Sequence, residues 1–299
     1  MDVPEDATTH TTFTPEEQAR RERFRERVLM EKRIAERMAL LRRKIVVASG
    51  KGGVGKTTAA VNLALAFDAA GDRVALLDAD LHGPGVPLAL GMSGARPAGG
   101  EQELQPVAYD ERLAVMSMAF LTADDAEAVI WRGPLKMAVL DQLLADVAWG
   151  EREWLVVDTP PGTGDELLSL AQRIRPLDGL VVVTTPQRAA VASARKSIAF
   201  ARQLNVPVLG VVENMGPFPC PDCGREIQLF GGGARAMAEE LGVPFLASVP
   251  FDPQAAAAAD EGRPAIVARP ASAVADAWRQ LAARLRDRLA RPSETPRNG

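Results

Sequence analysis

The sequence is poor in cysteine, because Cys220 and Cys223 are the only two among its 299 residues. Two thiols exclude a small fold that is held together by several disulfides. Long apolar runs are also lacking, and no stretch approaches the roughly 18 residues that a membrane-spanning helix needs. The first ten residues have neither the basic region nor the apolar region of a secretory signal. We therefore expect a cytoplasmic protein with no membrane partner.

An excess of positive charge is lacking as well, since 35 Lys and Arg residues stand against 39 Asp and Glu residues. The net charge of −4 argues against binding to a polyanion through bulk charge, so no nucleic-acid partner is expected. Hydrophobic residues make up 47% of the chain and charged residues 25%, which is ordinary for a folded protein and excludes global disorder. A chain of this length can bury a sizeable core as one α/β unit.

Positive charge is instead concentrated in one segment near the N-terminus. Residues 16–44 hold eleven Lys and Arg and six Asp and Glu, a net charge of +5, which leaves −9 for the rest of the chain. Phe24 and the apolar residues after it recur at near-helical spacing and predict one charged amphipathic helix over residues 16–43. This helix either lies solvated on the body or serves as an arm that docks a partner or stabilises a dimer. Residues 1–15 are expected to be disordered, and the Pro-rich residues 291–299 to form a flexible tail.

After the charged segment, short runs of Val, Ile and Leu alternate with longer helical stretches. The expected strands are Ile45–Ser49, Val74–Asp78, Leu113–Met116, Trp154–Asp158, Leu180–Thr184, Val208–Val212 and Phe245–Val249. Nearly continuous apolar strands separated by helices indicate a parallel sheet that is covered on both faces. Residues 44–290 are therefore predicted to form an α/β domain, with a mostly parallel twisted sheet of about seven or eight strands and helices on both faces.

A phosphate-binding loop is the strongest motif in the chain. The pattern Gly-x4-Gly-Lys-Thr follows the first expected strand and opens a helix, which is the arrangement of a P-loop. Its glycines let backbone N–H groups turn toward phosphate oxygens, and the helix N-terminus favours the same negative charge. We expect Lys56 to reach the β- and γ-phosphates of ATP, the Thr57 hydroxyl to bind Mg²⁺, and Thr58 to hold the α-phosphate. The full loop is Gly50, Lys51, Gly52, Gly53, Val54, Gly55, Lys56, Thr57 and Thr58.

Acidic residues follow two of the expected strands, at the edge where ligands bind in α/β sheets. Asp158 closes an apolar strand as a Walker B aspartate does, and we expect it to hold Mg²⁺ directly or through water. Asp78 is predicted to lie near Mg²⁺ and its waters, and Asp80 is the better candidate for orienting the attacking water. The alternative is that one of them only caps a short following helix. Residues 160–164, Pro-Pro-Gly-Thr-Gly, fit a switch segment that senses the γ-phosphate.

A second lysine, Lys51, lies inside the phosphate loop. The sequence Lys-Gly-Gly-x-Gly-Lys-Thr-Thr resembles the deviant Walker A motif of the dimeric ATPases that include MinD, ParA and the nitrogenase iron protein. In those proteins the extra lysine crosses a dimer interface, so the resemblance implies that Lys51 acts on the partner's nucleotide. It also implies that Asn214 reads the adenine edge, with Pro250 and Phe251 nearby. Without the resemblance, an Asn after a strand is usually a turn residue.

Four blocks in a fixed order resemble the Mrp/ApbC family of iron–sulfur cluster carrier proteins. The likeness covers residues 43–270, which is most of the chain. The blocks are residues 50–58, residues 78–87, residues 131–165 and residues 213–231. This resemblance implies a P-loop ATPase that hydrolyses ATP, carries an iron–sulfur cluster and passes it to apo-proteins. The expected partners are then a second copy of the chain, apo iron–sulfur proteins and cluster scaffold proteins.

The cysteine pair acquires a function through this resemblance. Two thiols in one chain cannot complete a four-thiolate site, whereas a two-fold axis would bring four together. Cys220 and Cys223 are therefore expected to bind a [4Fe–4S] cluster across a homodimer, beside the cofactors ATP and Mg²⁺. A shared zinc site or a redox dithiol remains open, since four thiolates suit zinc and iron–sulfur clusters alike. At the level of function, a MinD- or ParA-like ATPase that acts on membrane or DNA, or an electron donor like the nitrogenase iron protein, is the alternative.

The sequence departs from the family pattern at a few positions. Gly85 stands where the family usually has Ser, and Arg188 and Ser193 stand where acids are expected. A carboxylate at the position of Ser193 pairs with the signature lysine in relatives. Its absence leaves open how Lys51 is held, while the ATP site itself is unaffected.

Overall fold

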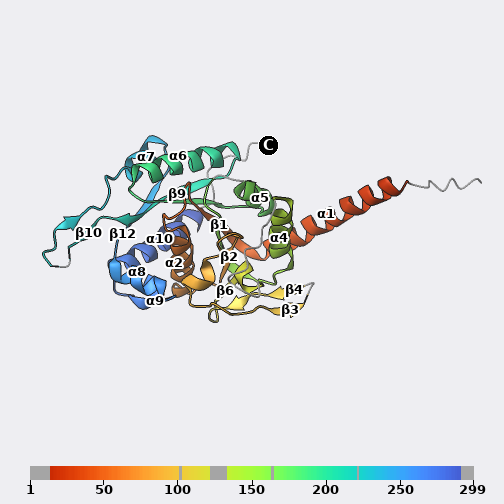
Figure 1. Ribbon diagram of the computed structural model, residues 1–299, viewed down its shortest axis with the longest axis horizontal. Coiled ribbons are helices and arrows are strands. Elements are labelled where there is room, and N and C mark those ends of the chain that lie inside the picture. Colours follow the sequence, from red (N-terminus) through yellow and green to blue (C-terminus); the bar gives the residue numbers. More distant parts are fainter. Residues whose placement is uncertain (1–13, 101–102, 122–132, 163–164, 221, 291–299) are drawn as a thin grey trace, which may run out of the picture.

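The computed structural model describes residues 14–100, 103–121, 133–162, 165–220 and 222–290. Eight strands form one sheet in the order β12–β9–β8–β1–β7–β2–β6–β5 (Figure 1). All pairs are parallel except β5 with β6, so the prediction of a mostly parallel α/β sheet is confirmed. The strands are β1 (Leu41–Ala48), β2 (Val74–Asp78), β5 (Val107–Ala108), β6 (Leu113–Ser117), β7 (Arg152–Asp158), β8 (Gly179–Thr184), β9 (Val208–Gly216) and β12 (Phe245–Pro250).

Three of the sequence expectations fall at least partly outside the described residues. They are the disordered N-terminus up to residue 13, the flexible tail over residues 291–299, and residues 163–164 of the expected switch segment.

Helices cover both faces of this sheet (Figure 1). One face packs against α2 and α10, and the other against α6 and α7, with α4 and α5 beside each other. The helices are α1 (Pro15–Ala39), α2 (Lys56–Ala69), α3 (Val86–Ala89), α4 (Gly133–Asp146), α5 (Asp165–Arg173), α6 (Arg188–Gln203), α7 (Ala234–Glu240), α8 (Pro253–Asp260), α9 (Ala265–Ala268) and α10 (Ala273–Ala290). Two small hairpins lie outside the sheet, β3 (Ala98–Gly100) with β4 (Glu103–Gln105), and β10 (Phe218–Pro219) with β11 (Glu226–Ile227). None of the helices described here is long and apolar enough to cross a membrane.

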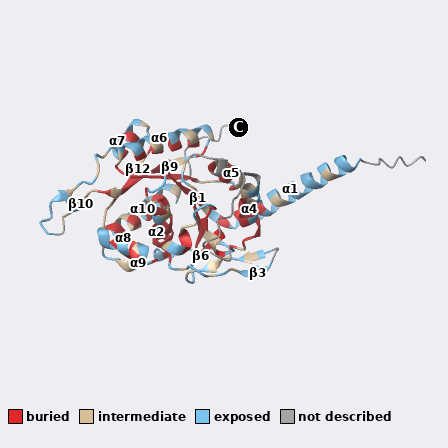
Figure 2. Cartoon of the chain, in the orientation of Figure 1, coloured by how far each residue is buried: buried red, intermediate tan, exposed pale blue. Residues whose placement is uncertain are grey.

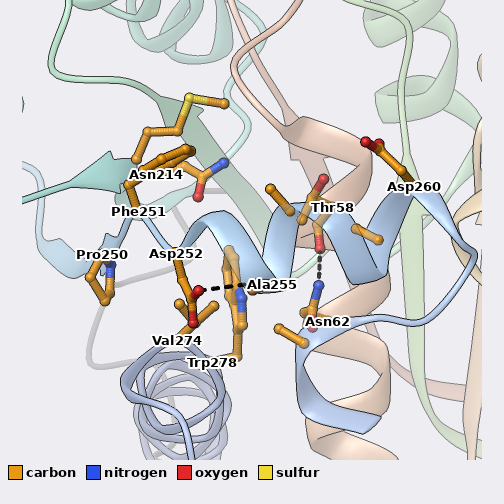
Figure 3. Close-up of a pocket in the computed structure, with 14 residues that line it drawn as sticks. Thr58, Asn62, Asn214, Pro250, Phe251, Asp252, Ala255, Asp260, Val274 and Trp278 are labelled. Atoms are coloured by element: carbon orange, nitrogen blue, oxygen red, sulfur yellow. Dashed lines mark hydrogen bonds between the residues drawn. The ribbon is translucent and has the colours of Figure 1, made fainter. Parts of the chain in front are cut away.

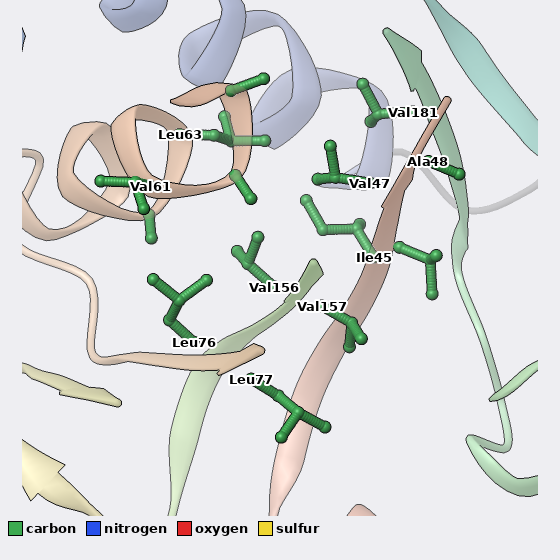
Figure 4. Packing of buried hydrophobic residues seen from close by; sticks show 14 of the residues in the cluster. Ile45, Val47, Ala48, Val61, Leu63, Leu76, Leu77, Val156, Val157 and Val181 are labelled. Atoms are coloured by element: carbon green, nitrogen blue, oxygen red, sulfur yellow. The ribbon is translucent and has the colours of Figure 1, made fainter. Parts of the chain in front are cut away.

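The core lies between the sheet and its helices (Figure 2). Every residue of β2 and of β8 is buried, as expected for inner strands of a parallel sheet that is covered on both faces. Figure 4 shows side chains of β1, β7 and β2 packed beside Val61 and Leu63 of α2. Burial of one such Val, Leu or Ile side chain stabilises the fold by about 1.5–3 kcal/mol. This rigid centre fixes the ends of β1, β7 and β2, from which the site is built.

The N-terminal helix α1 packs on the body with its C-terminal part only (Figure 1). It begins after a capping box, in which Thr14 and Glu17 satisfy each other's backbone N–H groups. Ile34 and Met38 are buried, and α1 packs against α4. Nearer the N-terminus, all residues from 20 to 29 are exposed, and Phe24 among them is 59% exposed. The helix thus contacts the body through its last turns.

A buried lysine joins α1 to the sheet. The structure ends α1 at Ala39 and begins β1 at Leu41, whereas the sequence pattern extended the helix to residue 43. The Lys44 ammonium is buried and donates hydrogen bonds to the carbonyl oxygens of Met38 at 3.2 Å and Leu41 at 2.5 Å. Burial lowers the pKa of Lys44. A cation at the last carbonyls of a helix is favourable, so this contact fixes the direction in which α1 leaves the body.

The two parts of α1 are expected to contribute very differently to stability. Met38→Ala removes a fully buried side chain and should lower the free energy of unfolding by about 2–5 kcal/mol. Phe24→Ala, on the exposed part of the same helix, should change it by no more than about 0.5 kcal/mol. Urea unfolding of both variants measures the difference. Equal effects of the two substitutions would show that the exposed part of α1 also packs on the protein.

Candidate functional site

The polar residues expected from the sequence meet at the carboxyl edge of three neighbouring strands. In the register of the sheet, Asp158 of β7 pairs with Val47 of β1 on one side and with Asp78 of β2 on the other. The phosphate loop, residues 50–58, follows β1 and leads directly into α2. Parallel pairing therefore brings the loop and both acidic strand ends together, as the sequence predicted.

Two glycines of the phosphate loop are required by its surroundings. Gly55 has a φ of 82°, and a Cβ there would collide with Nδ2 of Asn214. At Gly50 a Cβ would collide with the carbonyl oxygen of Ser193 in α6. Neither position can therefore take a larger residue without a shift of its surroundings. Gly55 is also the N-cap of α2 and provides no side-chain cap, which leaves the first N–H groups of the helix for an anion.

Asp158 accepts hydrogen bonds from the two polar side chains at the start of α2. Its Oδ1 accepts a hydrogen bond from the Lys56 ammonium at 2.5 Å, and its Oδ2 accepts one from the Thr57 hydroxyl at 2.7 Å. Lys56 is 6% exposed and Asp158 is fully buried. Burial raises the pKa of Asp158, and the Lys56 charge and both hydrogen bonds act in the opposite direction. The Thr57 hydroxyl and the Asp158 carboxylate are suitable ligands for Mg²⁺, which prefers hard oxygen atoms.

Asp78 is held more tightly than the sequence indicated. Its Oδ1 accepts a hydrogen bond from the Asp80 N–H, and its Oδ2 accepts bonds from the Val86 N–H and the Ser117 hydroxyl, all at 3.1 Å. Burial, followed by the negative charge of Asp158, raises the pKa of Asp78 to about 8. Burial beside a second carboxylate thus favours the protonated form of this carboxyl group. Through its three contacts it organises the loop that follows β2.

Asp80 lies at the start of that loop and is half-buried. Its Oδ1 accepts hydrogen bonds from the N–H groups of His82 at 3.3 Å and Gly83 at 3.2 Å. Asp80 therefore caps a turn, while the short helix α3 has Gly85 as its N-cap. The Asp80 charge contributes to raising the pKa of Asp158, so the two carboxylates lie close enough to interact.

A pocket of about 190 Å³ opens beside the phosphate loop, between α2, α8 and α10 (Figure 3). We refer to it as the α2/α8 pocket. It is lined by Thr58, Asn62, Asn214, Met215, Pro250, Phe251, Asp252, Ala255, Ala256, Ala259, Asp260, Ala265, Val274 and Trp278. The Asn214 Nδ2 donates to the Val54 carbonyl oxygen at 3.0 Å. This bond uses one of the two N–H groups of the amide, so the Asn214 side chain keeps one N–H donor and its Oδ1 acceptor.

The sequence pointed to only part of this pocket. Asn214, Pro250 and Phe251 were expected near the adenine, and all three line it. Trp278 of α10 was missed, because its position on an apolar helix face indicated packing alone. Ala255, Ala256 and Ala259 were missed as well, although the run of small side chains in α8 is a signal of open space beside this helix.

Lys51 stands apart from the buried cluster. Its side chain is exposed, and it forms no ion pair with any residue that the structure describes. The Ser49 hydroxyl donates to the Lys51 carbonyl oxygen at 3.0 Å, which fixes the backbone at this point. Ser193 lies against Gly50, the residue before Lys51, so this part of α6 does border the lysine. The structure thus leaves the Lys51 ammonium in solvent.

Both cysteines lie on the hairpin formed by β10 and β11, which projects from the body on the side opposite α1 (Figure 1). The Cys220 N–H donates to the Arg225 carbonyl oxygen at 2.8 Å, and the Gly224 N–H donates to the Cys220 carbonyl oxygen at 2.9 Å. Hydrogen bonds from the backbone of Cys223 and Asp222 lower the pKa of the Cys220 thiol. A lowered pKa favours the thiolate, which is the form that binds metal.

The two thiols are too few for a four-thiolate metal site on one chain. Cys220 is half-buried and Cys223 is exposed, and both are free thiols. Within the described part of the chain, no group of three or more His, Cys, Asp or Glu side chains could hold a metal ion. A four-thiolate site therefore needs ligands from outside this chain.

Comparison with known proteins agrees with this geometry. The model of the ParA group described as "NUBPL iron-transfer P-loop NTPase" matches residues 40–286. The chain is 45% identical to an iron–sulfur cluster carrier protein of Methanocaldococcus jannaschii, over 79% of this chain and 81% of the relative. It is 44% identical to a protein of the same name from Saccharolobus solfataricus, over 79% of this chain and 80% of the relative.

Solved structures share the fold. A nucleotide-binding protein from Archaeoglobus fulgidus, in complex with ADP, is 36% identical with a TM-score of 0.69, over 83% of this chain and 95% of that one. The cell division ATPase MinD of Pyrococcus furiosus is 23% identical with a TM-score of 0.58, over 82% of this chain and 98% of that one. The second likeness concerns the fold alone. Because the family model matches most of the chain and carrier proteins match it at 43–45% identity, the chain belongs to the family of iron-transfer P-loop NTPases.

Proposed function

We propose that the protein is an ATPase that carries a [4Fe–4S] cluster at the interface of a homodimer and transfers it to apo-proteins. One observation carries this proposal. The same chain holds a phosphate loop, whose Lys56 and Thr57 bond to Asp158, and a pair of free thiols on a projecting hairpin. The names of the relatives, iron–sulfur cluster carrier proteins, support the cargo. The ADP complex of the Archaeoglobus fulgidus protein supports the nucleotide.

The phosphate loop and its neighbours bind and orient the ATP phosphates in this proposal. Lys56 exchanges part of its contact with Asp158 for the β- and γ-phosphates, and the N–H groups at the start of α2 bind phosphate oxygens. Thr57 and Asp158 hold Mg²⁺, which neutralises charge that develops on the phosphates. Asp80 orients the attacking water, and Lys51, which is exposed, reaches the nucleotide of the second subunit.

The α2/α8 pocket takes the adenine. It opens next to Thr58, the last residue of the phosphate loop, so a nucleotide bound there continues directly into it. With one N–H bonded to Val54, the Asn214 amide still has its Oδ1 acceptor, which suits the amino group of adenine. This supports ATP as the substrate.

The cluster is the cargo of the proposed reaction cycle. A [4Fe–4S] cluster takes four thiolates, and each chain supplies Cys220 and Cys223 only. A two-fold axis through the cluster pairs the hairpins of two subunits and completes the ligand set. The hairpin projects from the body, so such pairing does not require the sheet to move (Figure 1). A spatial-organising ATPase of the MinD or ParA type has no need for this thiol pair.

Replacement of Asp80 tests the hydrolytic step. Asp80→Asn keeps the side chain's shape but weakens its hold on the attacking water, so turnover of ATP should fall by about 10²-fold or more. Binding of ATP should persist, because Lys56 and the loop backbone are unchanged. Steady-state phosphate release and equilibrium ATP binding measure the two effects, with the exposed Asp287→Asn as the matched control. Loss of ATP binding in Asp80→Asn would place Asp80 with the metal instead.

The raised pKa of Asp78 predicts a pH dependence of stability. Its pKa is about 8 in the folded protein, whereas an unperturbed Asp carboxyl has a pKa of 3.8. Between these values the folded protein holds a proton that the unfolded chain has lost, so this group lowers the free energy of unfolding as pH rises from about 4 to about 8. Asp78→Asn should remove that contribution.

Chemical denaturation in metal-free buffer at about pH 5 and about pH 8 measures this effect. The stability of Asp78→Asn relative to the unmodified protein should increase between the two pH values. If the difference between the two proteins stayed constant, the Asp78 carboxyl would already be ionised at the lower pH.

Replacement of either cysteine tests whether the protein carries an iron–sulfur cluster. Cys220→Ser and Cys223→Ser should each prevent retention of iron after anaerobic reconstitution with iron and sulfide, because a dimer then has two thiols instead of four. Hydrolysis of ATP should continue in both variants, since the phosphate loop lies on another segment. Asp222→Asn, between the two cysteines, is the matched control and should retain iron. Iron retained by either cysteine variant would contradict the proposal, and stoichiometric zinc without iron would favour a zinc site.

A further inference from the structure

One aromatic contact joins the α2/α8 pocket to the thiol hairpin. Phe251 lines the pocket (Figure 3), and its ring meets that of Phe218 edge to face, with 5.6 Å between the ring centroids. Phe218 is the first residue of β10, which leads to Cys220. Cys220 follows directly after β10, so only Pro219 lies between it and Phe218. The contact between the Phe251 and Phe218 rings therefore links the wall of the pocket to the segment that carries Cys220.

The backbone links the same two sites. Asn214 and Met215 line the pocket, and only five residues separate Asn214 from Cys220. Two of the five are the prolines at 217 and 219, whose fixed φ makes this connection stiff. The Phe251 N–H also donates to the Gly216 carbonyl oxygen at 3.1 Å. The strand entering the hairpin is thus tied to Phe251 through both its main chain and its ring.

A strained residue lies between the pocket and the hairpin. Met215 has a φ of 58°, in the left-handed region that residues with a side chain seldom adopt. Such a conformation costs about 1–3 kcal/mol and persists only where the surroundings enforce it. Because Met215 itself lines the pocket, a ligand in the pocket contacts the residue at which the chain bends toward the hairpin.

We propose that Phe218 is a positioning residue, whose contact with Phe251 couples occupancy of the α2/α8 pocket by a purine nucleotide to the arrangement of Cys220 and Cys223. The inference rests on the proposed function, since it takes the pocket to be the nucleotide's. Coupling between two binding sites is reciprocal. A nucleotide that changes the affinity of the thiols for a metal must therefore have its own affinity changed, by the same factor, when that metal binds the thiols.

Alkylation of the thiols measures the coupling without any bound cluster. The full chain, reduced and metal-free on the thiols, is treated with iodoacetamide in the presence and absence of Mg·ADP, and the rate at each cysteine is read by peptide mass spectrometry. We expect ADP to change the Cys220 rate by about fivefold or more, the lower end of usual coupling between sites. Phe218→Leu should reduce the change to less than about twofold while ADP still binds.

Conservative variants separate positioning from a general loss of structure. Phe218→Tyr keeps the ring and should keep the ADP effect, and Phe218→Met, a second variant without the ring, should lose it. Leu229→Ala, at an exposed residue just after β11, is the matched control and should behave like the unmodified protein. As the reciprocal measurement, ADP should change the Cd²⁺ affinity of the thiols, and Cd²⁺ should change the ADP affinity, by one and the same factor in the unmodified chain; Phe218→Leu should show neither change.

The outcomes distinguish this inference from the proposed function. If ADP binds but does not change alkylation, or if Phe218→Leu and Phe218→Met keep the full ADP effect, the coupling is overturned while the ATP site stands. If ADP does not bind the unmodified protein at all, the proposed function and the inference fail together.

Discussion

The contact of Asp158 with Lys56 and Thr57 is the interaction on which the rest of the site depends. It joins the end of β7 to the start of α2 at a buried point, where a carboxylate without a cation would be costly. Around it, the register of the parallel sheet places Asp78 beside Asp158 and the phosphate loop next to both. The charges to which we assign phosphate and metal binding are thus in place before a ligand arrives, as electrostatic preorganisation requires.

The second constraint is the number of thiols. One chain supplies the phosphate loop together with Asp158 and Asp78, but its two cysteines provide only half of the thiolates of a four-thiolate site. The exposed Lys51 is similarly without an ion-pair partner among the residues described. Both observations support the proposal that two subunits share their functional groups. The hairpin and the lysine belong to different parts of the fold, so they support it independently.

Local patterns were sufficient to predict the P-loop, the acidic strand ends and the parallel sheet. A P-loop is a continuous segment with its own backbone requirements, and an apolar strand that ends in Asp can be recognised from its own few residues. The end of α1 could not be predicted in this way, because Leu40 and Leu41 continue a helical spacing. The structure ends the helix there, and the buried Lys44 ammonium donates a hydrogen bond to the Met38 carbonyl oxygen in its last turn.

Features that depend on contacts between segments far apart in the chain could not be predicted from the sequence. The raised pKa of Asp78 follows from its burial and from the neighbouring Asp158, which the strand register places beside it. Trp278 reaches the pocket from α10, 64 positions after Asn214, and no local pattern connects the two. The roles assigned to Asp80, Asn214 and the cysteines are proposals, because they concern what these residues bind and not only where they lie.

The most direct test of the account is native mass spectrometry of the full chain after anaerobic reconstitution with iron and sulfide. The account predicts a dimer that carries one cluster of four iron and four sulfide ions, bound by four thiolates from two subunits. A monomer that carries the complete cluster would contradict the account, because one chain has only two cysteines with which to hold it.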